Sequence, residues 1–370
     1  MPFDPFRVHS VYSVDLPPAL RLKKTPMQSL TAHVSSGADL SAEQVEHAVA
    51  QLVSPDVDDT AKADFLRALR EKVETASEIA AFARSLLARA VDPGIVAADL
   101  PGPMLDVCGT GGDQLHLFNI STAAMFLLAA GGVVVVKHGN RAITSQCGGA
   151  DVLEELGVKI DLPPDALRRC VHTHGLGFVF APAYHPAFKA IVPVRKALAA
   201  QGIPTVFNLL GPLLNPAQPA YQLVGIFSPV LLPKYAEILA VLGRAHAWAV
   251  HGSGMDELSL AGPSAVHEVV DGTVREFTVD PAALGLPMCE VADLRGGDRV
   301  RNAAILTAIL DDTERGPKRD IVLLNAAAGF VITRLAPDLP AGLALAREQI
   351  ENGAALGKLD ALRQWEVIPE

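Results

Sequence analysis

The stretch Leu105-Asp-Val-Cys-Gly-Thr-Gly-Gly-Asp113 decides the fold class of this chain, together with Phe118-Asn-Ile-Ser-Thr122 just after it. A short apolar run enters a glycine-rich loop, and the second motif opens an apolar helix. A strand, a glycine loop and a helix N-terminus with hydroxyl side chains form a cradle of backbone N–H groups that suits a phosphate or pyrophosphate. The stretch therefore predicts a strand–loop–helix unit of an α/β fold with an anion site.

The loop departs from both standard nucleotide loops. Gln114 stands where the dinucleotide fingerprint has glycine, and no Gly-Lys-Ser/Thr follows, as a Walker A loop requires. Gly353-Ala-Ala-Leu-Gly-Lys-Leu359 is one residue short for Walker A and ends in leucine. The glycines alone would also fit a tight turn without a ligand, so the anion site depends on what else the fold brings to it.

Beyond Pro101-Gly-Pro103, short apolar runs alternate with helical stretches. The runs that predict strands are 104–107, 133–136, 178–180, 223–227 and 247–250. Strands that alternate with helices are typical of a largely parallel sheet. We therefore expect a larger α/β domain with a mostly parallel central sheet.

The preceding region predicts a small all-helical domain. Segments 41–53, 59–72 and 76–91 carry apolar residues at helical spacing, and Ser41-Ala-Glu-Gln44 is a capping box. Residues 187–201 predict a helical insertion between strands. We expect an N-terminal extension over 1–27, a helical domain over 28–97 to which the insertion 187–212 returns, and the α/β domain over 98–186 and 213–370.

The composition excludes several classes of protein. Half of the 370 residues are hydrophobic and glycine and proline show no period, so a collagen, a coiled coil or a disordered chain is excluded. With 31 basic against 41 acidic residues the net charge is −10, which disfavours nucleic acid or an anionic membrane as a partner. The uncharged run 117–136 contains Asn119 and a Gly-Gly pair, so we do not expect it to span a membrane. Four cysteines without CxxC spacing, and the lack of a secretory leader, predict a cytoplasmic protein.

Two further polar clusters follow predicted strands. Lys137-His-Gly-Asn-Arg141, with Thr144 and Ser145 beyond it, comes after the 133–136 run, where ligands bind in open α/β sheets. Gly252-Ser-Gly-Met-Asp-Glu257 places adjacent carboxylates on a turn, and Mg²⁺ takes one or two carboxylates plus substrate phosphates. Alone, the first would be a solvated basic turn and the second a solvated acidic surface. Beside the glycine loop, we interpret both as parts of one site.

Together these motifs closely resemble those of one family, anthranilate phosphoribosyltransferase, which has the nucleoside-phosphorylase-like phosphoribosyltransferase fold. The resemblance covers nearly everything from about residue 28 onward. It is carried by Gly109-Thr-Gly-Gly-Asp113, Asn119-Ile-Ser-Thr122, Lys137-His-Gly-Asn-Arg141, Phe180-Ala-Pro-Ala-Tyr-His-Pro186, Pro193-Val-Arg-Lys196, Phe207-Asn-Leu-Leu-Gly-Pro212, Gly254-Met-Asp-Glu257 and Gly296-Gly-Asp298. It implies a helical domain packed on an α/β domain, a homodimer, Mg²⁺ as cofactor and a step of tryptophan biosynthesis.

Carried over by matching position, the resemblance implies three groups of site residues. Phosphoribosyl diphosphate (PRPP) would be held by Gly109, Gly112, Asp113, Asn119, Ser121, Thr122, Lys137, Asn140, Thr144 and Ser145. Anthranilate would face Gly109, His138, Asn140 and Arg195, and Mg²⁺ would be bound by Ser121, Asp256 and Glu257. Arg195 offers a planar guanidinium for the benzoate carboxylate. No catalytic base is assigned, and His138 is the candidate.

Three positions depart from the family pattern. The family usually has glycine, threonine and serine where this chain has Gln114, Leu117 and Gly149. Leu117 and Gly149 each remove a hydroxyl group from the sugar-phosphate end of the site. Thr144, Ser145 or a water molecule would have to replace those donors.

The expected reaction is displacement of pyrophosphate from C1 of the ribose by the anthranilate amine, which gives N-(5-phosphoribosyl)anthranilate. Because C1 develops positive charge, positioning and electrostatics should outweigh any single base. Two alternatives stay open. One is a related nucleoside phosphorylase, or a phosphoribosyltransferase with another aromatic acceptor. The other is a non-catalytic paralogue, of which the three departures would be the marks.

Overall fold

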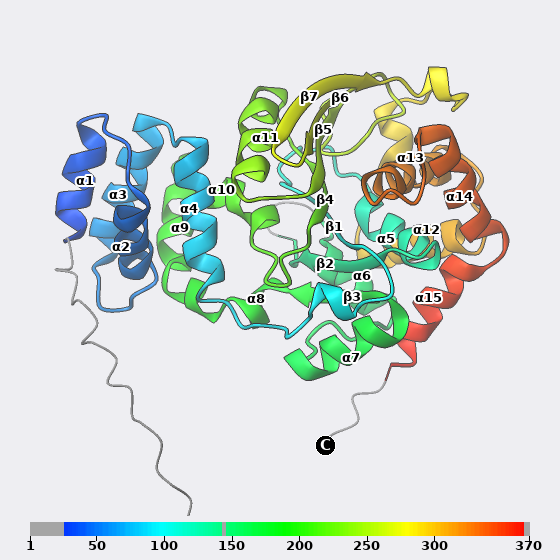
Figure 1. The fold of residues 1–370 in the computed structure, drawn as a ribbon, viewed down its shortest axis with the longest axis horizontal. Helices are drawn as coiled ribbons and strands as arrows, with labels where there is room; N and C mark the ends of the chain where they lie inside the picture. The colour runs from blue at the N-terminus through cyan, green and yellow to red at the C-terminus, as the bar shows by residue number, and fades with distance from the viewer. Residues whose placement is uncertain (1–25, 143–145, 366–370) are drawn as a thin grey trace, which may run out of the picture.

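The computed structural model describes residues 26–142 and 146–365, so the predicted Thr144 and Ser145 lie outside the described residues. Figure 1 shows a small helical part, in blue, beside a larger part built on a central sheet. The helical part begins with α1 (Met27–Ser35), α2 (Ala42–Leu52), α3 (Asp59–Lys72) and α4 (Ala76–Leu87). The predicted helices are confirmed, although α4 ends at Leu87 and not at residue 91.

Capping residues explain where two of these helices begin. Ser41 is the N-cap of α2 and forms a capping box with Gln44, and Thr75 does the same for α4 with Glu78. Each box supplies acceptors for backbone N–H groups that have no partner within the first helical turn. The capping box predicted at Ser41 is therefore confirmed.

A seven-stranded sheet in the order β3-β2-β1-β4-β5-β6-β7 forms the larger part. Its strands are β1 (Met104–Gly109), β2 (Val134–Gly139), β3 (Leu176–Phe180), β4 (Tyr221–Gly225), β5 (His246–Gly252), β6 (Ser264–Val270) and β7 (Thr273–Val279). Strands β1 to β5 pair in parallel, whereas β6 and β7 are antiparallel. The five predicted strands and the mostly parallel sheet are confirmed. The antiparallel pair was not predicted, because His267 and Glu268 interrupt the apolar residues of β6, and β7 is exposed over most of its length and carries no apolar run.

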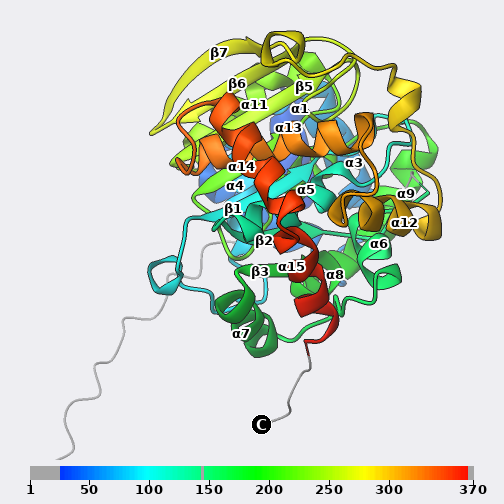
Figure 2. The same cartoon turned by 90° about the vertical axis from the view of Figure 1, so that its right-hand side faces the viewer.

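Helices cover both faces of the sheet. Helices α5 (Ile120–Ala130) and α13 (Pro317–Ile332) pack on one face, with α14 (Leu339–Glu351) and α15 (Ala354–Arg363) outside them (Figure 2). Helix α11 (Leu232–Val241) packs on the other face and also contacts α4. The other α-helices are α6 (Gly149–Glu155), α7 (Pro164–His174), α8 (Ala181–Tyr184), α9 (Val192–Ala200), α10 (Phe207–Leu210) and α12 (Arg299–Leu310).

Adjacent residues of β1 belong to different hydrophobic cores. Val107 joins the core formed with α5 and α13, whereas Cys108 joins the core formed with the helical part and α11. Successive strand residues point to opposite faces of a sheet, which explains the alternation. The core of the helical part is therefore continuous with one face of the sheet.

The inserted segment packs on the helical part. Helix α9 contacts α3, and Ile191, Val194 and Leu198 are buried in the same core as α1 to α4. Lys62 Nζ donates a hydrogen bond to the carbonyl oxygen of Ala190 (3.3 Å). The predicted helix 187–201 is a short 3₁₀ turn over Pro186–Ala190 followed by α9. The domain limits given above stay a prediction.

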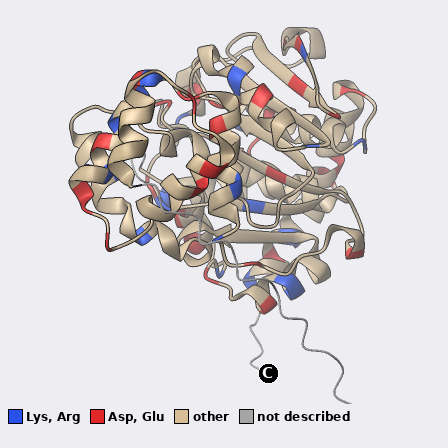
Figure 3. Cartoon of the chain, turned by 60° about the vertical axis from the view of Figure 1, so that its left-hand side comes forward, with Lys and Arg blue, Asp and Glu red and all other residues tan. Residues whose placement is uncertain are grey.

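Charged residues of both signs are interspersed along both parts of the chain (Figure 3). Several form ion pairs, such as Lys72 with Asp39 (2.6 Å) and Glu78 (2.8 Å). No helix in the described part of the chain combines the length and apolar character that crossing a membrane requires.

Val73, between α3 and α4, has a backbone conformation that valine rarely adopts. Its φ is 69° and its ψ is 108°, and its side chain is 52% exposed. Such a conformation costs a β-branched residue about 1–3 kcal/mol, whereas glycine adopts it freely and loses roughly 0.5–1 kcal/mol through the entropy of the unfolded chain.

We therefore expect Val73→Gly to raise the free energy of unfolding by about 1 kcal/mol, measured by urea denaturation. The control is Val96→Gly, because Val96 is similarly exposed (54%) but has a φ of −101°. This control should lower the free energy of unfolding. Equal destabilisation by both substitutions would contradict the strain at Val73.

Candidate active site

The order of the strands brings the predicted loops together at the carboxyl ends of the parallel strands. Strands β2 and β3 lie on one side of β1, and β4 and β5 lie on the other. In open α/β sheets, ligands bind in the crevice at such a switch point. The N–H of Thr110 donates to Gly225 O (2.9 Å), and Thr110 Oγ1 accepts from the N–H of Phe227 (3.0 Å). The loops after β1 and β4 are therefore fastened side by side.

The glycines after β1 serve two different purposes. Gly111 and Gly112 have φ values of 66° and 91°, and no atom lies within 4 Å of a Cβ built on either residue. At Gly109, in contrast, a Cβ would lie 2.3 Å from Asp256 Oδ2. Gly109 therefore admits a carboxylate, whereas Gly111 and Gly112 shape an exposed turn. Gln114 also has a positive φ, 57°, a conformation that glycine adopts more readily.

Asp256 and Glu257 bring two carboxyl groups against this loop. Asp256 Oδ2 accepts a hydrogen bond from the N–H of Gly111 (2.8 Å). Burial and the neighbouring Asp113 carboxylate raise the pKa of Asp256 from 3.8 to about 6. Burial and the Asp256 carboxylate raise the pKa of Glu257 well above 4.5, and the Lys137 ammonium opposes that increase. Carboxyl groups crowded in this way favour the uptake of a cation.

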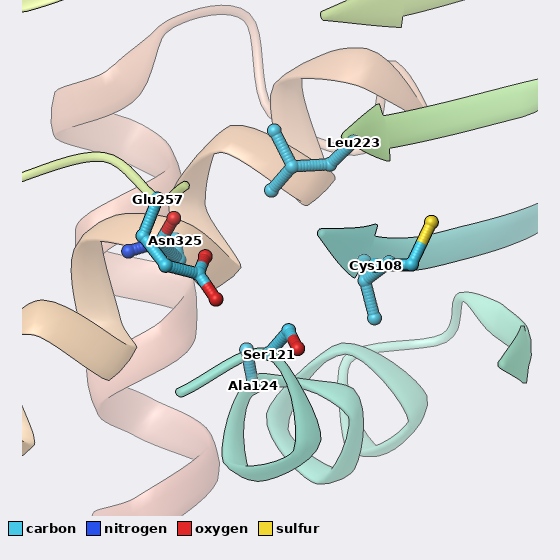
Figure 4. A pocket seen from close by; sticks show the side chains of 7 residues that line it. Cys108, Ser121, Ala124, Leu223, Glu257 and Asn325 are labelled. Atoms are coloured by element: carbon cyan, nitrogen blue, oxygen red, sulfur yellow. The ribbon is translucent and has the colours of Figure 1, made fainter. Parts of the chain in front are cut away.

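Lys137 supplies positive charge to the site. The residue is 4% exposed, and its Nζ donates to Ser121 Oγ (3.1 Å) and to Val107 O. Ser121 and Glu257 line the same small cavity, between the ends of β1 and β4 and helices α5 and α13 (Figure 4). The structure therefore places these three predicted residues together.

A buried aspartate near Lys137, Asp106, was not among the predicted site residues. Strands β1 and β2 pair only over their first residues, so the backbone groups beyond need other partners. Asp106 Oδ1 accepts a hydrogen bond from the N–H of His138 (3.1 Å). Burial raises the pKa of Asp106, and the Lys137 ammonium opposes that increase. A charged residue within the apolar run 104–107 was the signal that could have found it.

A row of rings connects the end of β2 to the inserted helix α9. It consists of His138, His185, Phe188 and Phe207, whose successive centroids are 5.4, 5.4 and 5.6 Å apart in edge-to-face contacts. Arg195 Cζ lies 5.1 Å from the centroid of the Phe207 ring. Burial lowers the pKa of Arg195, and no carboxylate of the described residues opposes that shift. Arg195 and His138, both predicted to face anthranilate, are the two ends of this row.

His138 is a neutral imidazole at neutral pH. Its Nδ1 lies 3.2 Å from Gly211 O, so Nδ1 carries the proton and Nε2 is an acceptor. Nε2 is buried and has no hydrogen-bond partner among the described residues. Burial and the neighbouring His185 lower the pKa of His138 to about 3. The ring can therefore accept a hydrogen bond from a ligand, but it is a weak base.

The other predicted residues lie around the same carboxyl ends of the strands. Thr122 is buried, and its Oγ1 lies 3.3 Å from a Cβ built on Gly149. Asn119 is the half-buried N-cap residue of α5. Asn140 is exposed directly after β2.

The donor set suits a hard divalent cation that is bound together with a substrate. Within residues 26–142 and 146–365, no three acidic, histidine or cysteine side chains form a group that could hold a metal ion. Asp256, Glu257 and the Ser121 hydroxyl are nevertheless hard oxygen donors. Mg²⁺ commonly takes one or two carboxylates and completes its shell with phosphate oxygens and water. These residues fit that pattern of binding.

Comparisons with known proteins agree with this arrangement. Residues 28–90 match the helical bundle domain of the glycosyl transferase family, and residues 101–356 match its a/b domain. A protein of Mesorhizobium japonicum named anthranilate phosphoribosyltransferase is 45% identical over 339 residues, which are 91% of this chain and 98% of that protein. The chain belongs to the anthranilate phosphoribosyltransferase family.

Solved structures of anthranilate phosphoribosyltransferases have the same fold. The Thermus thermophilus protein has a TM-score of 0.84 at 40% identity, over 91% of this chain and 98% of its own. The Saccharomyces cerevisiae protein in complex with PRPP and Mg has a TM-score of 0.81 at 28% identity, over 91% of this chain and 96% of its own. The latter protein in complex with 4-fluoroanthranilate has a TM-score of 0.79. The predicted family, fold class and enzyme class, a phosphoribosyl-transferring glycosyltransferase, are confirmed.

Proposed function

We propose that this chain transfers the phosphoribosyl group of PRPP to the amine of anthranilate, with release of pyrophosphate, as an enzyme of tryptophan biosynthesis. The proposal is carried by what lies together at the carboxyl ends of the strands. An exposed glycine turn, a buried lysine and crowded carboxyl groups lie there beside an aromatic row that ends at Arg195. The first three suit a diphosphate with its cation, and the row suits an aromatic acid. The relatives' names support this acceptor over a nucleoside.

PRPP would bind at the glycine turn. The N–H of Gly112, on the exposed turn, and the N-terminus of α5 provide donors for its phosphates. Lys137 lies beside Ser121 and supplies a cation for the leaving pyrophosphate. The assigned residues are Gly109, Gly112, Asp113, Asn119, Ser121, Thr122, Lys137 and Asn140, with Thr144 and Ser145 outside the described residues.

Mg²⁺ would be held by Asp256, Glu257 and the Ser121 hydroxyl, together with PRPP. Bound there, the ion would neutralise the charge that develops on pyrophosphate. The Gly111 N–H now donates to Asp256, so engagement of this carboxylate by a cation would free that donor for the substrate. The solved complex of the yeast relative contains PRPP and Mg, which supports the use of Mg²⁺ with this substrate.

Anthranilate would bind along the aromatic row. Arg195 would hold the carboxylate as a bidentate pair, which compensates the burial of its guanidinium. Phe188 and Phe207 provide edges for the ring, and Gly109 and Asn140 complete the assigned contacts. His138 Nε2, buried without a partner in the described part of the chain, would accept an N–H of the amine.

The reaction forms a bond between the amine nitrogen and C1 and breaks the bond from C1 to the pyrophosphate oxygen. The nitrogen becomes positively charged and then loses one proton to water. With a pKa of about 3, His138 cannot remove that proton before the bond forms, so its role is to orient the amine. Placement of the two substrates and stabilisation of pyrophosphate would carry most of the rate enhancement.

We also propose a homodimer in the cytoplasm, as the resemblance to the family implies. The four cysteines are free, and three of them are buried, as is usual for proteins of reducing compartments. Sedimentation velocity would give the oligomeric state.

The proposed function is tested by incubating the purified protein with PRPP, Mg²⁺ and anthranilate. Loss of anthranilate fluorescence, with release of one pyrophosphate per anthranilate consumed, supports the proposal. Fluorescence that stays constant while the protein still binds PRPP would indicate a non-catalytic paralogue. Turnover of a nucleoside with phosphate would indicate a phosphorylase.

Gly149→Ser is expected to lower the KM for PRPP about threefold. A Cβ at this position would lie 3.3 Å from Thr122 Oγ1 and 3.8 Å from Lys137 Cε, so the new hydroxyl would stand beside two predicted PRPP-binding residues. The control, Gly149→Ala, adds the same Cβ without a donor and should not lower the KM. If both variants give the same KM, the missing hydroxyl does not limit binding of PRPP.

A further inference from the structure

We propose that Asn302 is a positioning residue for the PRPP site, because it fixes the orientation of the Asn119 side-chain amide at the start of α5. The inference rests on the proposed function, in which Asn119 contacts PRPP. Asn302 lies in the first turns of α12 and is 1% exposed. The Gly296-Gly-Asp298 motif, to which no role has been given above, belongs to the same arrangement.

The two amides form a relay between two backbone groups. Asn302 Oδ1 accepts the N–H of Gly297 (2.8 Å), and Asn302 Nδ2 donates to Asn119 Oδ1 (2.9 Å). Asn119 Nδ2 in turn donates to the carbonyl oxygen of Cys147 (3.1 Å). A backbone N–H can only donate and a backbone carbonyl can only accept. Neither amide can therefore flip without losing hydrogen bonds at both of its ends.

Gly296, the first glycine of the motif, makes room for this relay. A Cβ on Gly296 would lie 2.4 Å from Asn302 Oδ1 and 2.8 Å from Phe118 Cα. The N–H of Gly296 donates to His116 O (2.9 Å), and the N–H of Phe118 donates to Leu294 O (3.3 Å). The segment 294–297 therefore lies directly along the second half of the glycine loop, where only glycine allows the close approach.

Asp298 sets the start of α12 and with it the position of Asn302. Its side chain is the N-cap and accepts the N–H of Arg301 (2.9 Å). Asn302 N–H donates to Asp298 O (3.0 Å), so Asn302 lies in the first hydrogen-bonded turn of the helix. The motif thus supplies a close-packed glycine at 296, a backbone N–H donor at 297 and a helix cap at 298 that together hold one amide.

The consequence concerns which atom Asn119 presents to PRPP. Its Oδ1 is occupied by Asn302, and one of its two N–H groups is occupied by Cys147 O. The second N–H of Asn119 Nδ2 is the donor that an anion or a sugar hydroxyl would meet. Without Asn302, the amide is free to turn its carbonyl oxygen toward the phosphates and to repel them.

The test measures the Kd of PRPP with Mg²⁺ by titration calorimetry in the absence of anthranilate, and the two KM values. Asn302→Asp keeps the acceptor for Gly297 N–H but cannot donate to Asn119. We expect it to raise the Kd and the KM of PRPP about tenfold and to leave the KM of anthranilate within about twofold. Asn302→Ser, measured in the same way, serves if the aspartate variant does not fold.

A double-mutant cycle with Asn119→Ala separates positioning from the added charge. If Asn302 acts through Asn119, Asn302→Asp has no further effect on the Kd in the Asn119→Ala background. A further tenfold rise in that background would overturn the inference, because it would mean that the new charge acts directly on PRPP. An unchanged Kd in both Asn302 variants would overturn it as well.

The same set of proteins distinguishes this inference from the proposed function. If the parent protein does not bind PRPP, or if Asn119→Ala leaves the Kd unchanged, the proposed site itself is wrong. If Asn119→Ala weakens binding and the Asn302 variants do not, the site stands and only the positioning role fails.

Discussion

Replacing Arg195 by alanine is expected to raise the KM for anthranilate about 100-fold and to leave the KM for PRPP within about twofold. The guanidinium stands above the Phe207 ring at the end of the aromatic row, and burial lowers its pKa with no carboxylate of the described residues opposing that shift. A bound carboxylate would supply the missing counter-charge. Removing the guanidinium therefore costs an interaction that only anthranilate makes.

Lys196→Ala is the matched control, because Lys196 follows Arg195 in α9 and is exposed. It removes one positive charge from the same helix and should change neither KM. Initial rates at varied concentrations of each substrate give both constants. Equal increases in the two KM values of Arg195→Ala would count against the assignment, since they would indicate general damage to the site.

The double substitution Asp256→Asn with Glu257→Gln is expected to lower kcat about 1000-fold and to abolish the saturable dependence on Mg²⁺. Both side chains keep nearly the same shape, so the Gly111 N–H retains an oxygen acceptor at position 256. What disappears is the negative charge that favours a cation at the glycine loop. A Mg²⁺ titration that matches the parent protein would reject the metal-binding role of this pair.

The single substitution Asp256→Asn is expected to stabilise the free protein while it lowers activity. Folding raises the pKa of Asp256 from 3.8 to about 6, so the folded state favours the protonated carboxyl group. Stability is therefore lost as the pH rises from about 4 to 6, and an asparagine does not undergo this loss. In the absence of Mg²⁺, the variant should exceed the parent in free energy of unfolding by roughly 2 kcal/mol at pH 7.

This stability difference should shrink toward pH 4, where the aspartate is protonated in the folded state and partly protonated in the unfolded state. Urea denaturation at pH 4 and pH 7 with a chelator present gives both values. A difference that does not depend on pH would show that ionisation of Asp256 is not its cause.

The elements predicted best from the sequence are those whose local signals agree with their packing. The capping box at Ser41 and the apolar runs that become β1, β2 and β5 fall where the sequence places them. The glycine loop was also predictable, because Gly111 and Gly112 have backbone conformations that few other residues adopt. Strand β7 has one solvated face and no apolar run, so periodicity does not reveal it.

Parts of the site depend on distant segments and could not be predicted from local signals. Strands β1 and β2 are not paired beyond their first residues, so the Asp106 carboxylate accepts the hydrogen bond of the His138 N–H. The register of the two strands, on which this role depends, cannot be derived from the sequence around Asp106. Asn302 lies 183 residues from Asn119, with which it shares a hydrogen bond. Burial beside His185 lowers the pKa of His138. The sequence shows a histidine that could act as a base, but it does not show this burial, so it could not predict that the base is weak.

The most direct test is a crystal structure of this chain with PRPP and Mg²⁺. The diphosphate should lie against the turn formed by Gly109–Asp113, within hydrogen-bond distance of its N–H groups and of Lys137, with the metal ion against Asp256 and Glu257. PRPP at saturating concentration that is absent from this turn, or bound at another part of the chain, would contradict the account.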